Sequence, residues 1–216
     1  MYHFEFVTEN QRAPIKHDLI AMITEVQNLL RNEFTFSFDF VGSDKYNMVT
    51  YDPKTNIGFD FDVNIEINDA EYNYTAKEIK TKLISAFDKV THKYGYDHAE
   101  NSTRVFKIKY KDRQNSKILH SCDFAVVNNY IDDMGYKRQE YIRYNKKQDS
   151  YSWEEQPKGY YMLPEKAKWI KNNGYQEEMR ALYLDKKNNN RDPHKHSRSL
   201  YAEAVHIICQ KHGFYD

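Results

Sequence analysis

The alternation of hydrophobic and polar residues predicts helices and strands in the first half of the chain. Residues 15–32 repeat Leu, Met, Ile and Val at helical spacing, which indicates an amphipathic helix. Phenylalanines alternate with polar residues over 34–42, which indicates a strand that ends at Gly42. The stretch 44–58 contains turn residues and is expected to be a loop, and a second strand follows over 58–67.

A further helix and two more strands are expected next. The helix has a capping-box signature at Thr75 and Glu78, and Gly95 can end it. Strands are expected over 104–110 and 117–127, joined by a polar turn.

The C-terminal third has a different pattern, which becomes helical and less regular from about position 150. Residues 163–190 indicate one or two helices with a break near Gly174, and 196–213 indicate a last helix. The polar stretch 188–196 is typical of a linker. These elements together predict an α/β (α+β) fold with a mixed sheet flanked by helices and a small helical lobe at the C-terminus.

The composition is that of a soluble globular protein, with 40% hydrophobic and 30% charged residues in 216. The 32 basic residues balance the 32 acidic ones, so no global field draws the protein to nucleic acid or to a membrane. No apolar run approaches the length of a membrane span, and the N-terminus lacks the pattern of a signal peptide. Cys122 and Cys209 are too few for a disulfide framework, so a cytoplasmic location is expected.

Acidic residues interrupt two of the predicted strands. Asp60 and Asp62 share one face of their strand, about 6.5–7 Å apart, while apolar residues take the other face. Asp123 is an isolated charge in the strand 117–127, and such a residue alone is more often a strand-end or hydrogen-bonded Asp. Three carboxylates on one sheet surface need cations, and Mg²⁺ or Mn²⁺ suit oxygen ligands. Two such ions can activate a hydroxyl and stabilise a leaving phosphate.

A Gly-Ser pair follows the first predicted strand. A strand that ends at Gly42 and turns at once allows backbone N–H groups to approach a phosphate, with the Ser43 hydroxyl as a further donor. The same pair is also an ordinary turn. The ordered series of a strand, Gly-Ser, a strand with Asp-x-Asp and a strand with Asp is more specific.

The segments "FVGS", "FDFDV" and "CDFAVV" occur in an order that resembles the nucleotidyltransferase core of polymerase-β-like enzymes. Within that group the chain is most similar to the cGAS/DncV-like nucleotidyltransferases (CD-NTases), the family of cyclic GMP–AMP synthase and its bacterial relatives. The segments "YYMLPEKA" and "GYQEE" resemble the part of cyclic GMP–AMP synthase that crosses between its two lobes. The resemblance covers about residues 20 to 190. It implies that 1–150 form the catalytic core and that 151–216 form a second lobe completing a cleft.

The resemblance also implies a role for each site residue. Gly42 and Ser43 would hold the triphosphate of a nucleoside triphosphate such as ATP. Asp60 and Asp62 would bind two Mg²⁺ (or Mn²⁺) ions, and Asp123 would bind one ion and help to deprotonate an attacking ribose hydroxyl. The expected product is a cyclic or short linear oligonucleotide, and the acceptor is a second nucleotide or another molecule.

In the second lobe, the resemblance places Arg180, Ser197 and Ser199 in contact with a base or phosphate. The chain departs from the family in three respects. The spacing from Gly42 to Asp60 is longer than usual, the second lobe is short, and the vertebrate zinc insertion is absent. We therefore expect no activation by double-stranded DNA.

Other residues with metal-ligand chemistry have simpler explanations. His194 and His196 lie in the linker-like stretch, where a zinc site is not the favoured interpretation. His206, Cys209 and His212 recur every three residues on a predicted helix, and packing of one helix face is favoured over a metal site.

Two basic clusters, at 104–117 and 136–147, have two interpretations. Solvated strand and turn faces are favoured over a rim that attracts polyphosphates or RNA. Trp153 and Trp169 are expected to pack within the lobes rather than to stack on bases.

Three hypotheses follow for the function. The first is an enzyme that joins nucleotides, and the second is an enzyme with the same chemistry that modifies RNA, a protein or a small molecule. The third is a catalytically inactive relative that binds nucleotides, which is disfavoured because all three acids are present.

Overall fold

The computed structural model describes residues 2–69, 73–157, 159–192 and 195–214. The chain divides into two compact units. We call the larger one, Phe6–Tyr51 with Asn56–Gln156, the sheet unit. The smaller one is called the helical unit, and it comprises Met1–Glu5, Asp52–Thr55 and Pro157–Asp216.

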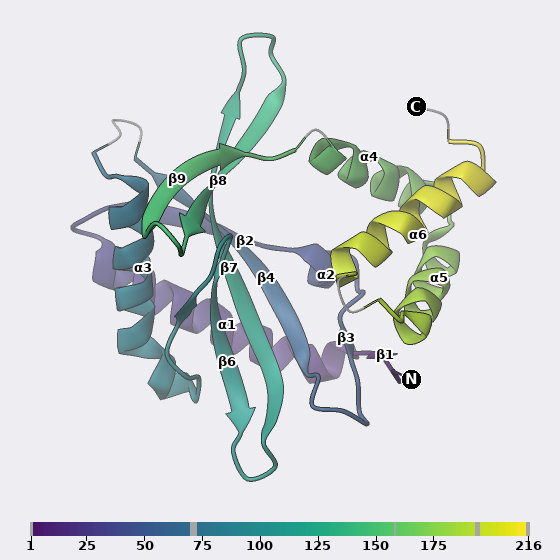
Figure 1. The fold of residues 1–216 in the computed structure, drawn as a ribbon, viewed down its shortest axis with the longest axis horizontal. Coiled ribbons are helices and arrows are strands. Elements are labelled where there is room, and N and C mark those ends of the chain that lie inside the picture. Colours follow the sequence, from purple (N-terminus) through teal and green to yellow (C-terminus); the bar gives the residue numbers. More distant parts are fainter. Residues whose placement is uncertain (1, 70–72, 158, 193–194, 215–216) are drawn as a thin grey trace. The chain divides into compact units, whose positions relative to one another are not determined.

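A mixed sheet forms the centre of the sheet unit (Figure 1). Its main path runs β2 (Thr35–Val41), β4 (Phe59–Asn68), β7 (Lys117–Ile131), β6 (Phe106–Asp112) and β5 (Glu100–Asn101). β4 and β7 are parallel, while β2–β4, β6–β7 and β5–β6 are antiparallel. β7 is the longest strand, and it pairs with β6 along its first part and with β8 (Lys137–Asn145) along its last part.

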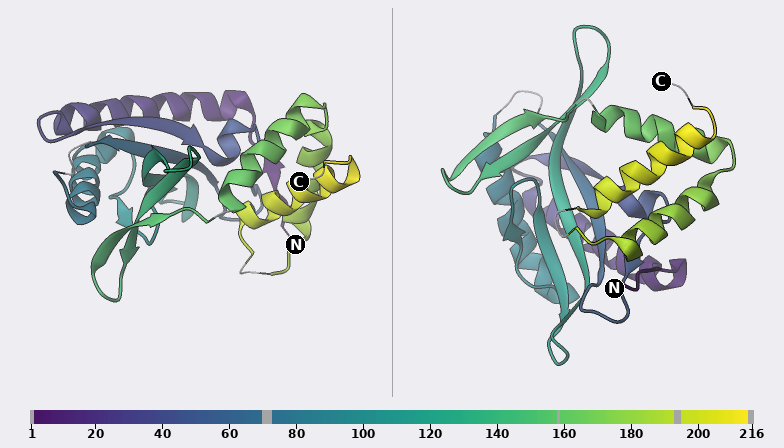
Figure 2. Two further views of the ribbon diagram at one scale, coloured as in Figure 1. Left: turned by 90° about the horizontal axis from the view of Figure 1, so that it is seen from above. Right: turned by 45° about the vertical axis from the view of Figure 1, so that its right-hand side comes forward.

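Two helices, α1 (Glu9–Leu30) and α3 (Ala76–Val90), cover one face of this sheet. Figure 2 shows α1 running alongside the strands. The apolar positions that recur at helical spacing in α1 and alternate in β4 are the ones that are buried. The core includes Leu19, Met22, Ile23, Val26, Phe61, Val63, Ile65, Leu83, Phe87, Phe106, Ile108 and Phe124. The other face of β4 carries polar residues, as the alternation predicts, and that of β7 carries Ser121 and Asp123 among apolar residues.

The helix ends follow from local hydrogen bonds. Thr75 and Glu78 form the predicted capping box: the Glu78 N–H donates to Thr75 Oγ1 (3.2 Å) and the Thr75 N–H donates to Glu78 Oε2 (2.8 Å). The helical path continues as a 3₁₀ turn, η1 (Thr91–Tyr94), and Gly95 ends it with a left-handed φ of 78°. α1 begins six residues earlier than predicted, because its polar first turns, which include Pro14, carry no apolar periodicity.

Three features of the chain differ from the prediction. The onset of helix at about 150 is wrong, because β9 (Ser150–Glu155) pairs with β8 and the first helix begins at Gly159. β8 and β9 were not predicted because charged and polar residues break their alternation. The expected loop 44–58 also contains structure, since α2 (Gly42–Lys45) extends into it and β3 (Thr50–Tyr51) pairs with β1 (Glu5–Phe6).

The helical unit contains the helices α4 (Gly159–Asn172), α5 (Gln176–Asn189) and α6 (Ser197–Lys211). Gly174, with φ 78°, separates α4 from α5, which confirms the predicted break. Trp169 packs against Phe214, with 5.2 Å between the ring centroids, and Trp153 packs against the core of the sheet unit, so packing is confirmed for both. None of the described helices is both long and apolar enough to cross a membrane.

The N-terminal residues belong to the helical unit through specific contacts. The Phe4 N–H donates to Asn188 Oδ1 (2.6 Å), and Asn188 Nδ2 donates back to the Phe4 carbonyl oxygen (3.1 Å). Lys187 Nζ lies 4.1 Å from the centroid of the Phe4 ring. The His3 N–H donates to Asp52 Oδ2 at 3.0 Å, which ties in the short segment Asp52–Thr55.

Candidate active site

The register of β4 and β7 brings the predicted acids together on one face. Asp62 pairs with Asp123 and Asp60 pairs with Ser121, in parallel strands whose axes are about 4.8 Å apart. Residues paired in this way point to the same side, so the three carboxylates lie on the face opposite the helices. We call Asp60, Asp62 and Asp123 the acid row. Ser121 Oγ donates to Asp60 Oδ1 and thereby orients that carboxylate.

Gly42 lies directly against the acid row. β2 runs antiparallel to β4 and pairs Val41 with Asp62, so the next residue turns over the Asp62 side chain. Gly42 has a left-handed φ of +64°, and a Cβ built on it would collide with the Asp62 carboxylate. This position therefore requires glycine for two reasons, backbone conformation and the proximity of Asp62.

Ser43 follows Gly42 as the second residue of α2 and is partly exposed. Its carbonyl oxygen accepts the N–H of Met48 at 2.8 Å, which closes the turn. A buried network supports α2 from behind: Asp44 receives Arg12 Nη1 at Oδ1 and Lys16 Nζ at Oδ2, both at 2.6 Å. Sequence reasoning did not identify this network, because Arg12 and Lys16 are far from Asp44 along the chain and carry no shared motif.

Lys107 is a basic residue that lies beside the acid row. β6 pairs antiparallel with β7 and places Lys107 opposite Asp123, on the same face. Its Nζ lies 3.1 Å from Asp123 Oδ1 and 3.7 Å from Asp60 Oδ1. Sequence reasoning placed it in a solvated basic cluster. Its alternation with Phe106 and Ile108 already put it on the polar face of β6, but the register that brings it to Asp123 has no sequence signal.

Burial and charge act in opposite directions on this pair. Burial raises the pKa of the Asp123 carboxyl, and the Lys107 ammonium opposes that rise. Burial also lowers the pKa of Lys107, but the carboxylates of Asp60 and Asp123 outweigh it, so the pKa of Lys107 is raised. Lys107 therefore remains protonated and neutralises part of the negative charge of the acid row.

The donor set of the acid row fits a hard divalent cation in its chemistry. Carboxylate oxygens are the ligands that Mg²⁺ and Mn²⁺ prefer, and Asp123 Oδ1 is buried without a well-aligned hydrogen bond although the Lys107 ammonium is near. Among the described residues, however, no three His, Cys, Asp or Glu side chains are arranged as a metal site. Metal binding by Asp60, Asp62 and Asp123 stays a prediction.

The opposite face of the same strands holds aromatic residues. A cavity of about 470 Å³ is lined by residues that include Phe59, Tyr96, Tyr110 and His120. His120 is buried, its Nδ1 lies 3.0 Å from the Tyr96 hydroxyl, and its ring stacks on Tyr110 with 4.7 Å between centroids. Burial lowers the pKa of His120 to about 4, against a smaller opposing effect of Asp18. The imidazole is therefore neutral near pH 7.

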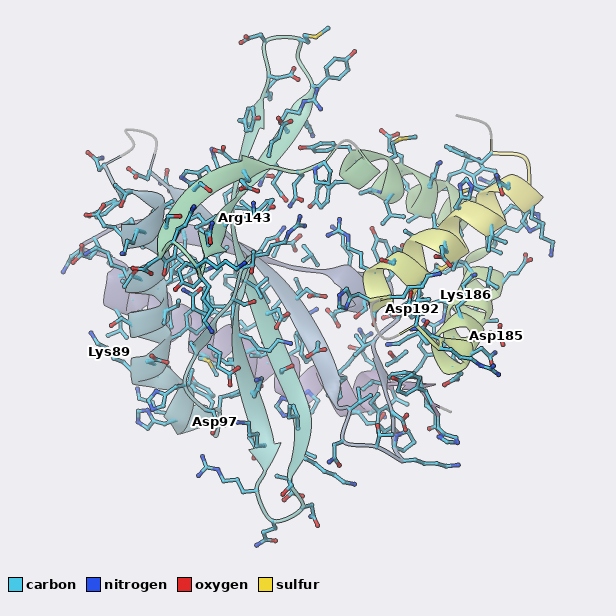
Figure 3. All side chains as sticks on the ribbon, viewed as in Figure 1. Lys89, Asp97, Arg143, Asp185, Lys186 and Asp192 are labelled. Atoms are coloured by element: carbon cyan, nitrogen blue, oxygen red, sulfur yellow. The ribbon has the colours of Figure 1, made fainter. Side chains whose placement is uncertain are left out.

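The basic clusters are paired within themselves to a large extent. Lys109 pairs with Glu100 (2.5 Å), and Arg143, which is labelled in Figure 3, pairs with Glu154 (2.9 Å). Asp97, also labelled there, receives both Lys111 and Arg113. These pairs fit the favoured interpretation of solvated strand and turn faces, with Lys107 as the exception.

The remaining candidates belong to the helical unit. Arg180 in α5 is 18% exposed and lies near Glu177, with 3.6 Å from Nε to Oε1. Ser197 and Ser199 are in the first turn of α6. Their contacts with a nucleotide stay predictions.

His206 and Cys209 of α6 and His212, its C-cap, are not arranged as a metal site. Cys209 is buried and His212 stacks on Tyr175 at 3.7 Å, so packing is confirmed for these two, while His206 is exposed. His196 is the N-cap of α6, and His194 lies outside the described residues.

Comparison with solved structures shows that the chain has the fold of the CD-NTases, which confirms the fold class expected from the motifs. The chain is similar to the STING-associated CdnE c-di-GMP synthase from Capnocytophaga granulosa, with a TM-score of 0.60 and 13% identity over 96% of this chain and 63% of that one. For the Vibrio cholerae cyclic AMP–GMP synthase DncV, the TM-score is 0.56 and the identity 14%, over 88% and 52% of the two chains. For the CD-NTase CdnG from Bradyrhizobium diazoefficiens in complex with GTP, the values are 0.51 and 13%, over 84% and 44%.

At these identities the similarity concerns the fold. The chain spans from 44% to 63% of the length of these three proteins. No protein-family model matches the sequence. A search of curated proteins finds no match either.

Proposed function

We propose that the chain is a metal-dependent nucleotidyltransferase that uses nucleoside triphosphates as donors. The observation that carries the proposal is the acid row beside the Gly42 turn, on one sheet of a CD-NTase fold. The CdnG and DncV structures, which include complexes with GTP, support nucleoside triphosphates as the substrate class.

In the proposed reaction a ribose hydroxyl attacks the α-phosphate in line. A bond forms between the ribose oxygen and the α-phosphorus, the bond to the β-phosphate oxygen breaks, and pyrophosphate leaves. Asp60, Asp62 and Asp123 would hold Mg²⁺ or Mn²⁺, which supplies charge neutralisation and Lewis acidity when bound. Asp123 would accept the hydroxyl proton. Backbone N–H groups at Gly42 and the Ser43 hydroxyl would bind the β- and γ-phosphates.

The leading product class is a cyclic or short linear oligonucleotide, as expected from similarity to cyclic dinucleotide synthases. Arg180, Ser197 and Ser199 are proposed to contact a base or phosphate, and activation by double-stranded DNA is not expected. The second candidate is transfer of a nucleotide to RNA, a protein or a small molecule. Its chemistry at the donor nucleotide is the same as in the first candidate, because the acceptor site defines function in this fold.

Incubation of the pure protein with labelled NTPs and Mg²⁺ or Mn²⁺, with products resolved by mass spectrometry, tests the proposal. Pyrophosphate release with an oligonucleotide product supports the first candidate. Turnover that requires added RNA or protein supports the second. Absence of turnover under all these conditions, with nucleotide binding retained, would identify an inactive nucleotide-binding relative.

A further inference from the structure

β6 carries Lys107 and Lys109, and comparing these two lysines shows what distinguishes the position of Lys107. Lys107 and Lys109 lie two residues apart on β6, so both point to the face that carries the acid row. Lys109 pairs with Glu100, whereas Lys107 lies within ion-pair distance of both Asp60 and Asp123. The difference between the two lysines is therefore the partner, not the strand or the face.

The environment of Lys107 is more enclosed than that of a surface ion pair. Its side chain is 29% exposed and that of Asp123 is 22% exposed, whereas Asp60 is 55% exposed, so the enclosed pair is Lys107 with Asp123. Charges in such a place are poorly screened by water, so their interaction is stronger than that of an exposed pair. An ammonium so near to two carboxylates supplies the positive charge that three clustered acids need.

We propose that Lys107 is the built-in counter-ion of the acid row, which a divalent cation must displace in order to bind. This inference rests on the proposed function of the acid row. The ammonium and a divalent cation would compete for the same oxygens of Asp60 and Asp123, and two positive species in one enclosed place repel each other. The free cation therefore binds weakly.

A triphosphate changes this balance. Its oxygens bring negative charge to the Gly42–Ser43 turn beside the acid row, and that charge attracts both the divalent cation and the displaced ammonium. Binding of cation and nucleotide is then positively coupled, and the coupling is reciprocal. Because of Lys107, the acid row thus binds a divalent cation tightly only when a nucleotide binds with it.

Calorimetric titration with Mn²⁺, alone and with a non-hydrolysable ATP analogue, tests this inference without turnover. In the wild-type protein we expect the analogue to tighten Mn²⁺ binding by at least about tenfold. Lys107→Met keeps an unbranched side chain that is one atom shorter, and it removes the charge. It should bind free Mn²⁺ about tenfold more tightly than wild type and lose most of the coupling. Lys109→Met, on the same face of β6, is the matched control. Its effect on Mn²⁺ affinity should be much smaller, because Lys109 pairs with Glu100 and has a smaller electrostatic effect on Asp123 than Lys107 has.

The thermal unfolding midpoint gives a second readout. Without metal, Lys107→Met should unfold at a lower temperature than Lys109→Met, and Mn²⁺ should restore more of the loss in Lys107→Met. Unchanged or weaker affinity of Lys107→Met for free Mn²⁺ would overturn the inference, as would a wild-type protein that binds free Mn²⁺ as tightly as in the presence of the analogue. If Lys107→Met does not fold, Lys107→Gln replaces it. The effect of the ATP analogue on Mn²⁺ binding to the wild-type protein then still tests the inference.

Failure of the proposed function has a different signature. In that case Mn²⁺ does not bind to the wild-type protein even with the nucleotide analogue, or it still binds to Asp62→Asn with wild-type affinity. Mn²⁺ binding that requires Asp62 but ignores Lys107 contradicts the inference alone.

Discussion

The two faces of strands β4 and β7 contrast in how they use the same stretch of backbone. On the helix-covered face, Phe61 and Phe124 are fully buried, and His120 is held neutral among aromatic rings. On the other face, the residues next to them in sequence, Asp62 and Asp123, belong to the acid row, and Lys107 Nζ lies 3.1 Å from Asp123 Oδ1. A shift of one residue along a strand thus separates side chains that stabilise the fold from side chains available for chemistry.

The largest expected effect is the loss of turnover from a substitution on the face that carries the acid row. Asp62→Asn removes a carboxylate while keeping the size of the side chain, so nucleotide turnover should fall by about three orders of magnitude. The free energy of unfolding should stay within about 1 kcal/mol of wild type, because the packed face is untouched. Turnover is measured by pyrophosphate release and stability by denaturant unfolding. Wild-type turnover in this variant would remove Asp62 from the mechanism.

A substitution on the helix-covered face should instead reduce stability. Phe124 stacks on Phe106, with 5.0 Å between ring centroids, and is completely buried. Phe124→Ala should therefore lower the free energy of unfolding by about 3–5 kcal/mol. Urea denaturation measures the loss. Leu119→Ala on the same strand, where the side chain is 42% exposed, is the control and should cost much less.

His120, on the helix-covered face, should also make stability depend on pH. Folded His120 has a pKa of about 4, whereas an unfolded histidine titrates near 6.5, so between these values the unfolded chain binds a proton that the folded chain does not. The His120 contribution is thus fully present above pH about 6.5 and is lost as the pH falls toward 4, by roughly 3 kcal/mol in total.

Unfolding free energies at several pH values test this expectation. His120→Phe should flatten the dependence between pH 6.5 and 4. An equal slope in His120→Phe and wild type would assign the dependence to other groups.

A smaller effect on stability is expected at Gly42, where the turn contacts the acid row. Gly42→Ala requires a left-handed φ and pushes a Cβ against Asp62, so it should cost about 1–3 kcal/mol in stability. It should also lower turnover, because Asp62 must move. Gly135 has φ +82° with nothing within 4 Å of an added Cβ, so Gly135→Ala separates the backbone effect from the collision. Equal turnover in the two variants would mean that the collision has no consequence.

The smallest effect is expected at Ser43. Ser43→Ala removes one proposed hydrogen bond to the phosphates, so KM for NTP should rise several-fold, up to about tenfold, with kcat little changed. Initial-rate kinetics over a range of NTP concentrations separate the two constants. A fall in kcat with constant KM would place Ser43 in the chemical step instead of in substrate binding.

Strict alternation explains which parts could be predicted from the sequence. Over 34–40 and 58–67 apolar residues alternate with polar ones, so strand and face follow from the local pattern. Over 117–127 the strand follows from its run of apolar residues, with Asp123 as an isolated charge. β8 and β9 carry mixed charges and buried Gln139, so their local pattern does not indicate a strand.

The candidate site also has one part that the sequence predicts and one part that it does not. The shared face of Asp60 and Asp62 depends on neighbouring residues and was predictable. The approach of Lys107 to Asp123 depends on the register between β6 and β7, and a slip of one residue would place Lys107 on the opposite face. Such long-range register has no signature in a single sequence.

The contact between Phe4 and Asn188 has a consequence for synthesis of the chain. The two residues are 184 positions apart, and the hydrogen bonds between them are part of the helical unit. At about 5–20 residues per second, a ribosome would add Asn188 roughly 10–40 s after Phe4. Phe4 must therefore wait, without this partner, until α5 has been translated, whereas the strands of the sheet unit can pair earlier.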